Sequence, residues 1–428
     1  MNTILTLEDA DHALKQFIPR TDKKERYTLE RMRTLMRLLG DPQNQLRVIH
    51  VAGTSGKTST SYYLAGLLRD RGYTVGLSVS PHIDAVSERA QINLSPLAEA
   101  EYCRELSVFL ATIQDFDIRP TYFEVLVAFA FWLFAKRQVD YAVIEVGLGG
   151  LLDGTNVIDR ADKVCVVTDI GLDHTEILGD TIEQIAAQKA GIIQDDNAVY
   201  MLSQSPEVEA VVRRQADQHH AQLHIQSAQP PSDQTFLDRN LSLATTVVNA
   251  LLQLDDRPQL TPEQASSVSK MQIPGRMETV AYQGKKVILD GAHNAQKIRA
   301  LVRSLQLQTP NENMTMLVSF ASTKSTYLDE CLTELRKLGD TVVVTEFNLG
   351  QDVPRKPIPS QELADACNKA GFKHVSIESD PLTAIRQARE TQASTILVTG
   401  SLYLIGQVRQ SFRKVDHTPK RLDFSSVV

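Results

Sequence analysis

The chain has 428 residues, of which 42% are hydrophobic and 23% are charged, and its formal net charge is −7. This length and composition exclude a disordered protein and one built of membrane spans, and they indicate two or three globular domains. The negative charge argues against a nucleic-acid-binding surface, and four widely spaced cysteines are typical of reduced thiols. Because the sequence suggests neither a signal peptide nor a spanning stretch, we expect a cytoplasmic protein that binds neither nucleic acid nor a membrane.

A glycine-rich turn follows the first expected strand. We expect helical structure over residues 5–40 and a strand at 46–52. The next residues form the turn Gly53-Thr54-Ser55-Gly56-Lys57-Thr58-Ser59, which opens a helix. Backbone N–H groups in such a turn point into a concavity, and the helix N-terminus adds partial positive charge. The pattern therefore predicts a site for the phosphates of a nucleotide.

The turn is a short form of the P-loop. The general motif has a glycine where this chain has Val51, so the motif here is Gly-x-x-Gly-Lys-Thr, from Gly53 to Thr58. Lys57 can reach the outer phosphates of ATP, and the hydroxyl of Thr58 or Ser59 can face Mg²⁺. The alternative is an ordinary strand-to-helix turn that binds no ligand.

The rest of the first half alternates between strands and helices. Such alternation implies right-handed crossovers and a mostly parallel sheet. The expected strands are 75–79, 139–146, 163–168 and 198–202, and the expected helices lie near 97–113, at 121–138 and from about Thr181.

Polar residues follow several of these strand ends. Ser80, Glu145 and His174 should meet the P-loop at one edge of the sheet, where α/β proteins bind ligands. Because an unpaired buried carboxylate is costly, we expect Glu145 to bind a metal ion; a salt bridge is the alternative. His174 can ligate the same metal or can be a hydrogen-bonded structural residue. From its spacing alone, Lys189 is a surface lysine at a helix end.

The alternation restarts after a break near residues 271–276. Strands are expected near 286–290, 314–320, 341–346 and 395–399, with helices between them. This pattern indicates a second α/β domain, and we place the two domains at 1–273 and 274–428. Arg276, Asp290 and His293 can hold a nucleotide from this second domain, and a domain-linking salt bridge is the alternative.

Taken together, the motifs resemble the Mur ligase superfamily, specifically folylpolyglutamate synthases and dihydrofolate synthases, over about residues 29–409. The pieces that carry the resemblance are Leu39-Gly40-Asp41-Pro42-Gln43, His50-Val51-Ala52-Gly53-Thr54, Ser80-Pro81-His82, Glu88-Arg89, Phe123-Glu124, Glu145-Val146-Gly147-Leu148-Gly149-Gly150, Thr155-Asn156-Val157, Gly171-Leu172-Asp173-His174-Thr175, Lys189-Ala190-Gly191-Ile192-Ile193, Pro274-Gly275-Arg276, Asp290-Gly291-Ala292-His293-Asn294 and Gly400-Ser401-Leu402-Tyr403.

The resemblance implies a fold and a reaction. The fold would be an N-terminal P-loop domain of the Mur ligase ATPase type, with a mostly parallel sheet, and a smaller C-terminal Rossmann-like α/β domain that closes over ATP and glutamate. The reaction would add L-glutamate to the γ-carboxylate of (tetrahydro)folate through an acyl phosphate made from ATP. The alternatives are a dihydrofolate synthase or bifunctional enzyme, and, in a different class, a divergent nucleotide-binding paralogue without ligase activity. We expect a monomer.

The resemblance also implies roles for individual residues. Two Mg²⁺ ions would be held, one by Ser80 and Glu145 and the other by Glu145 and His174. Lys189 would be carbamylated and would help to fix the second metal. Lys57, Lys189 and His174 would serve catalysis. Arg276, Asp290 and His293 would hold ATP together with the P-loop residues.

The chain departs from the family's pattern at several positions. Leu151 stands where Arg is usual, and Gln188 stands where Glu usually precedes the carbamylated lysine. The usual His-Gln-x-x-Asn reads Arg239-Asn240-Leu241-Ser242-Leu243, so the adenine-contacting Asn is missing or shifted to Asn240.

Further departures lie in the second half and in the P-loop. Ala295 replaces a Pro, and Gly-x-x-x-Asp-Lys reads Ala321-Ser322-Thr323-Lys324. Thr58 replaces a Gly that is common in the folate members and is more like the cell-wall Mur ligases. Because Glu145, His174 and Lys189 are kept, we expect the metal chemistry to survive.

Overall fold

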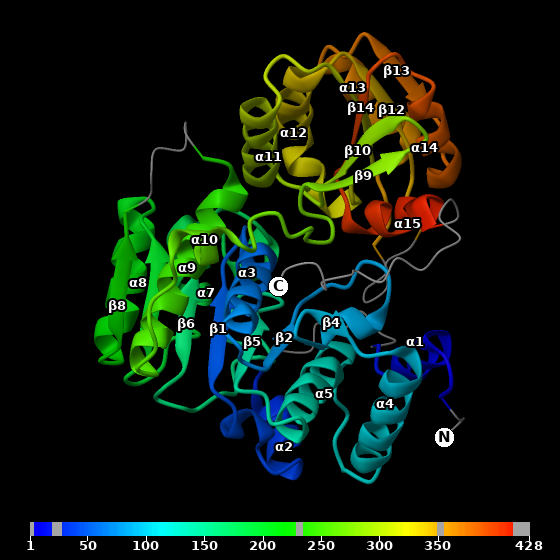
Figure 1. Cartoon of the computed structure of the whole chain (residues 1–428). Coiled ribbons are helices and arrows are strands. Elements are labelled where there is room, and N and C mark those ends of the chain that lie inside the picture. The colour runs from blue at the N-terminus through cyan, green and yellow to red at the C-terminus, as the bar shows by residue number, and fades with distance from the viewer. Residues whose placement is uncertain (1–3, 19–27, 228–233, 349–354, 414–428) are drawn as a thin grey trace. The chain divides into compact units, whose positions relative to one another are not determined.

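The computed structural model describes residues 4–18, 28–227, 234–348 and 355–413. The chain divides into two compact units, Met1–Met271 and Gln272–Val428, which are described separately (Figure 1). Within the described residues, no helix has both the length and the apolar character needed to cross a membrane.

The first unit is built on an eight-stranded sheet with the strand order β4-β3-β2-β5-β1-β6-β7-β8. The strands are β1 Val48–Ala52, β2 Val75–Ser78, β3 Gln91–Ile92, β4 Ser95–Pro96, β5 Tyr141–Glu145, β6 Val164–Val167, β7 Ala198–Leu202 and β8 Gln222–Gln226. All pairs are parallel except β2–β3 and β3–β4. The mostly parallel sheet predicted from the alternation is confirmed.

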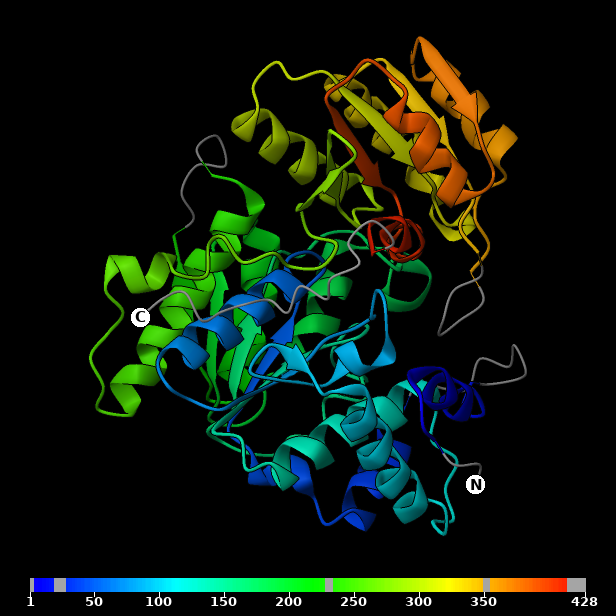
Figure 2. The ribbon, with the colours of Figure 1, turned by 45° about the vertical axis from the view of Figure 1, so that its right-hand side comes forward.

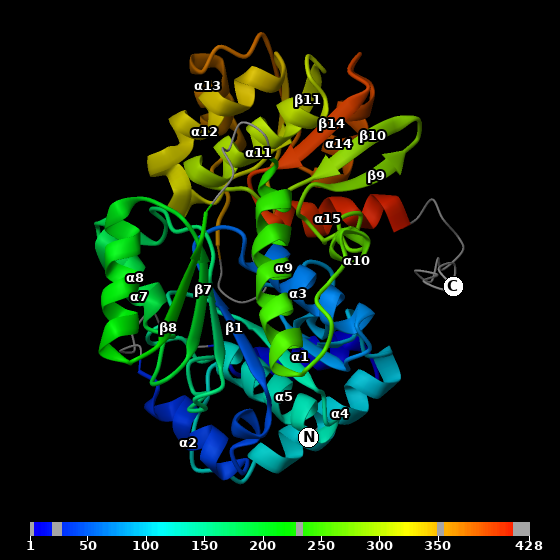
Figure 3. The same cartoon turned by 60° about the vertical axis from the view of Figure 1, so that its left-hand side comes forward.

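Helices cover both faces of this sheet. They are α1 Leu7–Lys15, α2 Glu30–Leu38, α3 Lys57–Asp70, α4 Glu99–Ile113, α5 Tyr122–Lys136, α6 Thr175–Leu178, α7 Ile182–Ala190, α8 Pro206–Gln218, α9 Phe236–Leu254 and α10 Pro262–Ser266, with 3₁₀ turns at Pro42–Gln45 and Val86–Arg89. Helices α3 and α9 pack side by side (Figure 3), while α4, α5, α7 and α8 belong to the cores on the opposite face.

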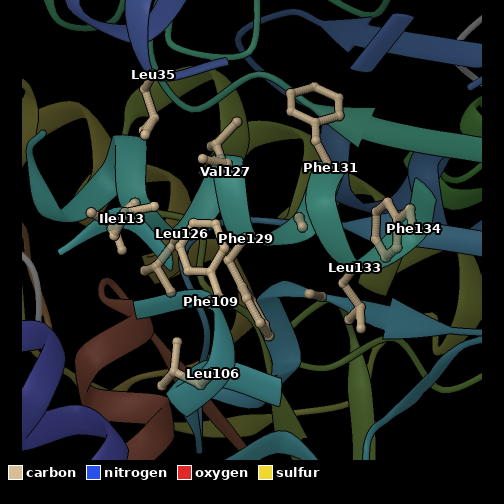
Figure 4. Close-up of a cluster of buried hydrophobic side chains, with 14 of the residues drawn as sticks. Leu35, Leu106, Phe109, Ile113, Leu126, Val127, Phe129, Phe131, Leu133 and Phe134 are labelled. Carbon is tan, nitrogen blue, oxygen red and sulfur yellow. The ribbon is translucent and has the colours of Figure 1, made fainter. Parts of the chain in front are cut away.

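Helix α5 forms the centre of the largest of these cores. It begins at a capping box in which Thr121 and Glu124 satisfy each other's backbone N–H groups. Phe129 of α5 packs edge-on against Phe109 of α4, with ring centroids 5.4 Å apart (Figure 4). Burial of each such side chain stabilises the fold by roughly 1.5–3 kcal/mol. The strongly hydrophobic α5 is therefore explained as part of the core.

Helix α9 runs along the strands of the sheet, from their carboxyl ends to their N-terminal ends. Its C-terminal cap, Asp255, accepts hydrogen bonds from Arg47 at 2.8 Å, from Tyr73 at 2.6 Å and from Tyr141 at 2.8 Å, all near the N-terminal ends of strands. Although partial burial raises the pKa of Asp255, these three hydrogen bonds lower it to about 2. At roughly 1.5 Å per residue, the other end of α9 therefore reaches the carboxyl edge of the sheet.

The second unit, coloured from yellow-green to red in Figure 2, holds a six-stranded sheet with the order β13-β12-β11-β14-β10-β9. Of the strand pairs in this sheet, only β9–β10 is antiparallel. Its strands are β9 Glu278–Tyr282, β10 Lys285–Leu289, β11 Met314–Val318, β12 Thr341–Val344, β13 His374–Ile377 and β14 Thr395–Thr399. Its helices are α11 Ala295–Gln308, α12 Leu328–Leu335, α13 Ser360–Lys369, α14 Pro381–Arg389 and α15 Leu402–Arg413, with 3₁₀ turns at Ser322–Tyr327 and Arg336–Leu338.

The differences from the sequence-based expectations lie mainly at sheet edges. The helix expected over residues 5–40 consists of α1 and α2, and residues 19–27 between them lie outside the described part. Strands β3, β4, β8, β9 and β13 were not predicted. Edge strands have one open side, so they can be short or partly exposed and lack the continuous apolar run that marks a buried parallel strand.

Candidate active site

The P-loop connects β1 to α3, and two of its glycines are sterically required. Gly53 has φ 151°, and a Cβ placed on it would overlap Oγ1 of Thr168. Gly56 has φ 89°, and its Cβ would lie 2.7 Å from Oδ1 of Asn240 on α9. These close approaches explain the two glycines of the motif and place α9 directly beside the loop.

The loop is tied to the segment that follows β6. The backbone N–H groups of Thr54 and Ser55 donate to the carbonyl oxygen of Asp169, at 2.9 and 3.0 Å, and Thr54 Oγ1 donates to Gly171 O at 3.0 Å. The expectation that the N–H groups of the turn point into a concavity is therefore wrong for these two. The N–H groups of residues 57–59 precede the first intrahelical bond of α3, from Thr60 N to Gly56 O, and are the geometric candidates for phosphate.

Two lysines donate hydrogen bonds to Gly53, the first residue of this loop. Lys57 Nζ donates to Gly53 O at 3.0 Å, and Lys189 Nζ, from the end of α7, donates to the same oxygen at 2.9 Å. Lys189 is only 4% exposed. Its interpretation as a surface lysine is wrong, because the packing of α7 beneath the loop turns its side chain inward.

Glu145 ends β5, next to β1, and its side chain is buried beside the loop. Its Oε1 accepts a hydrogen bond from Thr58 Oγ1 at 2.9 Å, and its Oε2 is 3.4 Å from the backbone N of Ser80. The structure therefore brings Glu145, Ser80 and the P-loop together, as their strand-end positions predicted. It also gives Thr58 a partner, which the sequence alone did not.

His174 follows β6 in the left-handed region, with φ 51°. Its ring nitrogens lie 3.9 Å from Asp173 Oδ1 and 3.6 Å from Glu176 Oε1. The loops after β5 and β6 are in contact, since a Cβ on Gly149 would lie 3.0 Å from Leu178.

The donor set at this edge has a definite chemical character. In the described part of the chain, no three His, Cys, Asp or Glu side chains form a metal-binding group. The oxygen donors shown beside the loop are the carboxylate of Glu145 and the hydroxyl of Thr58, and the backbone of Ser80 lies next to them. Hard oxygen donors of this kind suit Mg²⁺, which is bound by few protein ligands together with substrate phosphates.

The first turn of α9 adds residues that sequence reasoning placed only loosely. Arg239 forms a 2.9 Å salt bridge with Asp169, whose carbonyl holds the P-loop. Asn240 is 4% exposed beside Gly56, and its Nδ2 has no hydrogen-bond partner among the described residues. Leu243, at the position of the usual Asn, is buried in the core. The structure places Asn240 beside the loop, so a shifted Asn is present there, while its contact with adenine stays a prediction.

The departures after β5 leave the backbone intact. Leu151 N donates to Gln188 O at 2.7 Å, and Asn156 Nδ2 donates to Leu151 O and to Gly191 O at 3.1 and 2.9 Å. The end of α7, which carries Lys189, is therefore held by main-chain atoms and by the side chain of Asn156, and none of these bonds uses the side chain of residue 151 or 188.

In the second unit, the three predicted residues gather at the end of β10. The carboxylate of Asp290 accepts backbone N–H groups of Met277 and Ala292, each at 2.9 Å. Burial raises the pKa of Asp290, against the opposing charge of Arg276. His293 Nδ1 donates to Gly291 O at 2.7 Å, and Lys297 Nζ lies 3.1 Å from His293 Nε2.

Comparisons with known proteins place this architecture in a family. The family model of the Mur ligase middle domain matches residues 51–277, and that of the dihydrofolate synthetase C-terminal domain matches residues 271–411. The dihydrofolate synthase/folylpolyglutamate synthase of Bacillus subtilis is 31% identical over 418 residues, covering 90% of this chain and 95% of that protein.

Two further relatives agree. The dihydrofolate synthetase of Saccharomyces cerevisiae is 31% identical over 414 residues, covering 89% of this chain and 96% of that protein. A structure of the Mycobacterium tuberculosis folylpolyglutamate synthase complexed with ADP and AMPPCP matches with a TM-score of 0.82 and 28% identity, over 96% of this chain and 99% of that one. The chain belongs to the folylpolyglutamate synthase and dihydrofolate synthase family of the Mur ligase superfamily.

Proposed function

We propose that the chain is an ATP-dependent ligase that joins L-glutamate to the γ-carboxylate of a folate through an acyl phosphate. Besides family membership, the observation that carries this proposal is the meeting of Lys57 and Lys189 at Gly53 O beside the buried Glu145. Transfer of a phosphoryl group to a carboxylate brings anions together, and such a site needs fixed cations and oriented dipoles.

The chain's own groups have assignable roles in this reaction. Lys57 would turn from Gly53 O to the outer phosphates of ATP, and the N–H groups of residues 57–59 would contact the phosphate oxygens. In the second unit, Arg276, Asp290 and His293 would hold ATP. Exclusion of water would protect the acyl phosphate until the amino group of glutamate attacks it.

Magnesium would be held by Ser80, Glu145, His174 and Lys189, the last as a carbamate. Bound Mg²⁺ would supply positive charge to the phosphoryl oxygens. A carbamate on Lys189 would keep one hydrogen on Nζ, so the hydrogen bond to Gly53 O remains possible, and it would remove the repulsion between two ammonium groups at that oxygen.

Dihydrofolate synthase activity, alone or combined with the first, is the second candidate. It is favoured by the family model that matches residues 271–411, which describes the C-terminal domain of dihydrofolate synthetases. The two activities share the acyl phosphate chemistry and differ in the acceptor.

A cytoplasmic location and a monomeric state stay predictions. Light scattering on the protein as it leaves a size-exclusion column measures its mass and so tests the monomeric state.

The acceptor decides between these functions. Phosphate release is measured with ATP, Mg²⁺ and glutamate, and either tetrahydrofolate or dihydropteroate, with each component omitted in turn. Release that requires tetrahydrofolate supports folylpolyglutamate synthesis, and release that requires dihydropteroate supports dihydrofolate synthesis. ATP binding without release on either acceptor would support the nucleotide-binding paralogue and contradict the ligase.

A further inference from the structure

Lys297, in the first turn of α11, contacts the imidazole of His293. Its Nζ lies 3.1 Å from Nε2 of the ring, and Nδ1 of the ring lies 2.7 Å from the carbonyl oxygen of Gly291. Because a carbonyl oxygen only accepts hydrogen bonds, Nδ1 carries a hydrogen, and because an ammonium group only donates, Nε2 is the acceptor. The ring is therefore neutral, and in this form it has no N–H group left to offer a phosphate oxygen.

The ring of His293 is in turn tied to the segment that carries Arg276. The backbone N–H of Gly291 donates to Gly275 O at 2.9 Å, and Arg276 Nη1 donates to the same oxygen at 3.0 Å. The ammonium group of Lys297 is therefore joined, through one ring and two peptide groups, to the arginine that we assign to ATP.

A neutral ring orients an ammonium group without cancelling its charge, as a carboxylate would. The charge of Lys297 also reaches the buried carboxylate at the end of β10. Burial raises the pKa of Asp290, and the charges of Arg276 and Lys297 oppose this rise. Both Lys297 and His293 are only half-buried, so a ligand can approach them. Lys297 therefore adds a cation with a defined position to the residues assigned to ATP.

We propose that Lys297 is a nucleotide-binding residue of the second unit, whose ammonium group, seated on His293, donates hydrogen bonds to the phosphates of ATP. This inference rests on the proposed function, in which the second unit holds ATP, and it gives His293 the part of a seat for that ammonium group. An ammonium group has three N–H donors, of which the ring takes one. Hydrogen bonds between an ammonium group and a phosphate are stronger than those between neutral groups.

The test measures the binding of a non-hydrolysable ATP analogue by calorimetry in the presence of Mg²⁺. Lys297→Met keeps much of the length of the side chain and removes its charge. We expect the dissociation constant of the analogue to rise about 10-fold or more. Adenosine, which has no phosphates, is titrated as a competitor and should bind the parent and the variant alike.

Stability separates this role from a structural one. A cation in the first turn of a helix opposes the helix dipole, so Lys297→Met should unfold at the same urea concentration as the parent or at a higher one. Lys369→Met is the matched control for the loss of one positive charge. Lys369 is exposed at the end of α13 and pairs with Asp329 at 3.5 Å, and this variant should bind the analogue like the parent.

A double-mutant cycle tests the seat. His293→Phe keeps an aromatic ring but offers Lys297 no acceptor nitrogen, so the ammonium group loses its fixed position. If the two residues act as one unit, the chain with both substitutions should lose less affinity than the product of the two single losses. Losses that multiply would mean that His293 and Lys297 bind the nucleotide separately.

Three results would overturn the inference. They are unchanged affinity for the analogue in Lys297→Met, an equal loss of adenosine binding in that variant, and losses that multiply in the cycle. The titrations need neither folate nor glutamate. Failure of the proposed function would instead show as absent acceptor-dependent phosphate release by the parent chain, and a parent that binds no analogue would contradict both.

Discussion

The side-chain nitrogens of Lys57 and Lys189 meet at one atom, the carbonyl oxygen of Gly53, at 3.0 and 2.9 Å. The two ammonium groups are therefore within about 6 Å of each other, in a setting where Lys189 is buried and their repulsion is poorly screened. Two changes relieve it: an anionic phosphate that draws Lys57 away, or conversion of Lys189 to an anionic carbamate. Both changes belong to the proposed reaction.

Removal of the Lys189 side chain should abolish ligase activity. In Lys189→Ala the group that would become the carbamate is absent, and a small carboxylate such as acetate can enter the space and supply the anion. We expect phosphate release to fall at least about 100-fold and to recover in part with added acetate. Acetate should not raise the activity of the parent, and full activity of the variant without acetate would contradict the carbamate role.

A methyl group at Gly53 should distort the P-loop and weaken nucleotide binding. Its Cβ would overlap Thr168 Oγ1 and approach the Thr168 backbone, so the end of β1 must move away from β6. We expect Gly53→Ala to bind ADP at least about 10-fold more weakly, as measured by calorimetry. Gly72→Ala is the control, because Gly72 also has positive φ, 85°, but a Cβ there meets nothing within 4 Å; an equal effect in both variants would refute the steric account.

The positions of these residues could be predicted from the sequence only in part. Alternation of strands and helices, together with the rule that ligands bind beyond the carboxyl ends of parallel strands, was enough to bring Ser80 and Glu145 to the P-loop. Contacts made through main-chain atoms left no such pattern. Spacing places Lys189 at a helix end but does not reveal that the helix end lies beneath Gly53.

Long-range packing hid the contribution of α9. Asn240 lies beside Gly56, and Arg239 pairs with Asp169, whose carbonyl holds the loop. Both residues come far later in the chain than the P-loop, in a segment that looks polar. Thr235 and Asp238 form a capping box there, and this was the available local signal for where the helix begins. Which of its side chains faces Gly56 depends on the packing of α9 against α3, which no local pattern specifies.

Asn240 should matter for nucleotide binding and little for folding. Because its Nδ2 has no hydrogen-bond partner among the described residues, Asn240→Ala removes no hydrogen bond through that atom, and an unsatisfied buried donor is itself unfavourable. We expect ATP to bind about 10-fold more weakly, with a free energy of unfolding within about 1 kcal/mol of the parent. A large loss of stability at unchanged ATP affinity would assign Asn240 to the core instead.

The Asp255 cluster should give the first unit an acid-sensitive part of its stability. The pKa of this carboxyl is about 2 in the folded chain, below the ordinary value of 3.8. Its ionised form therefore stabilises the fold above about pH 4, and this contribution is lost as the pH falls from about 4 towards 2. After allowance for solvent screening it amounts to about 1–2 kcal/mol.

Urea unfolding at a series of pH values checks this contribution. Asp255→Asn should be less stable than the parent at about pH 7, and the difference between the two should shrink as the pH falls through the window. A difference that does not depend on pH would mean that Asp255 acts through its shape and neutral hydrogen bonds rather than through its charge.

The formation of an acyl phosphate is tested most directly by following the oxygen atoms of the acceptor. A folate labelled with ¹⁸O in its γ-carboxylate is incubated with ATP, Mg²⁺ and L-glutamate, and the released phosphate and the folate product are examined by mass spectrometry. If the carboxylate attacks the γ-phosphate, and glutamate then displaces that oxygen from carbon, the phosphate must carry one ¹⁸O and the folate must gain one glutamyl residue. Unlabelled phosphate, or phosphate released without a glutamylated product, would contradict this account of the chain.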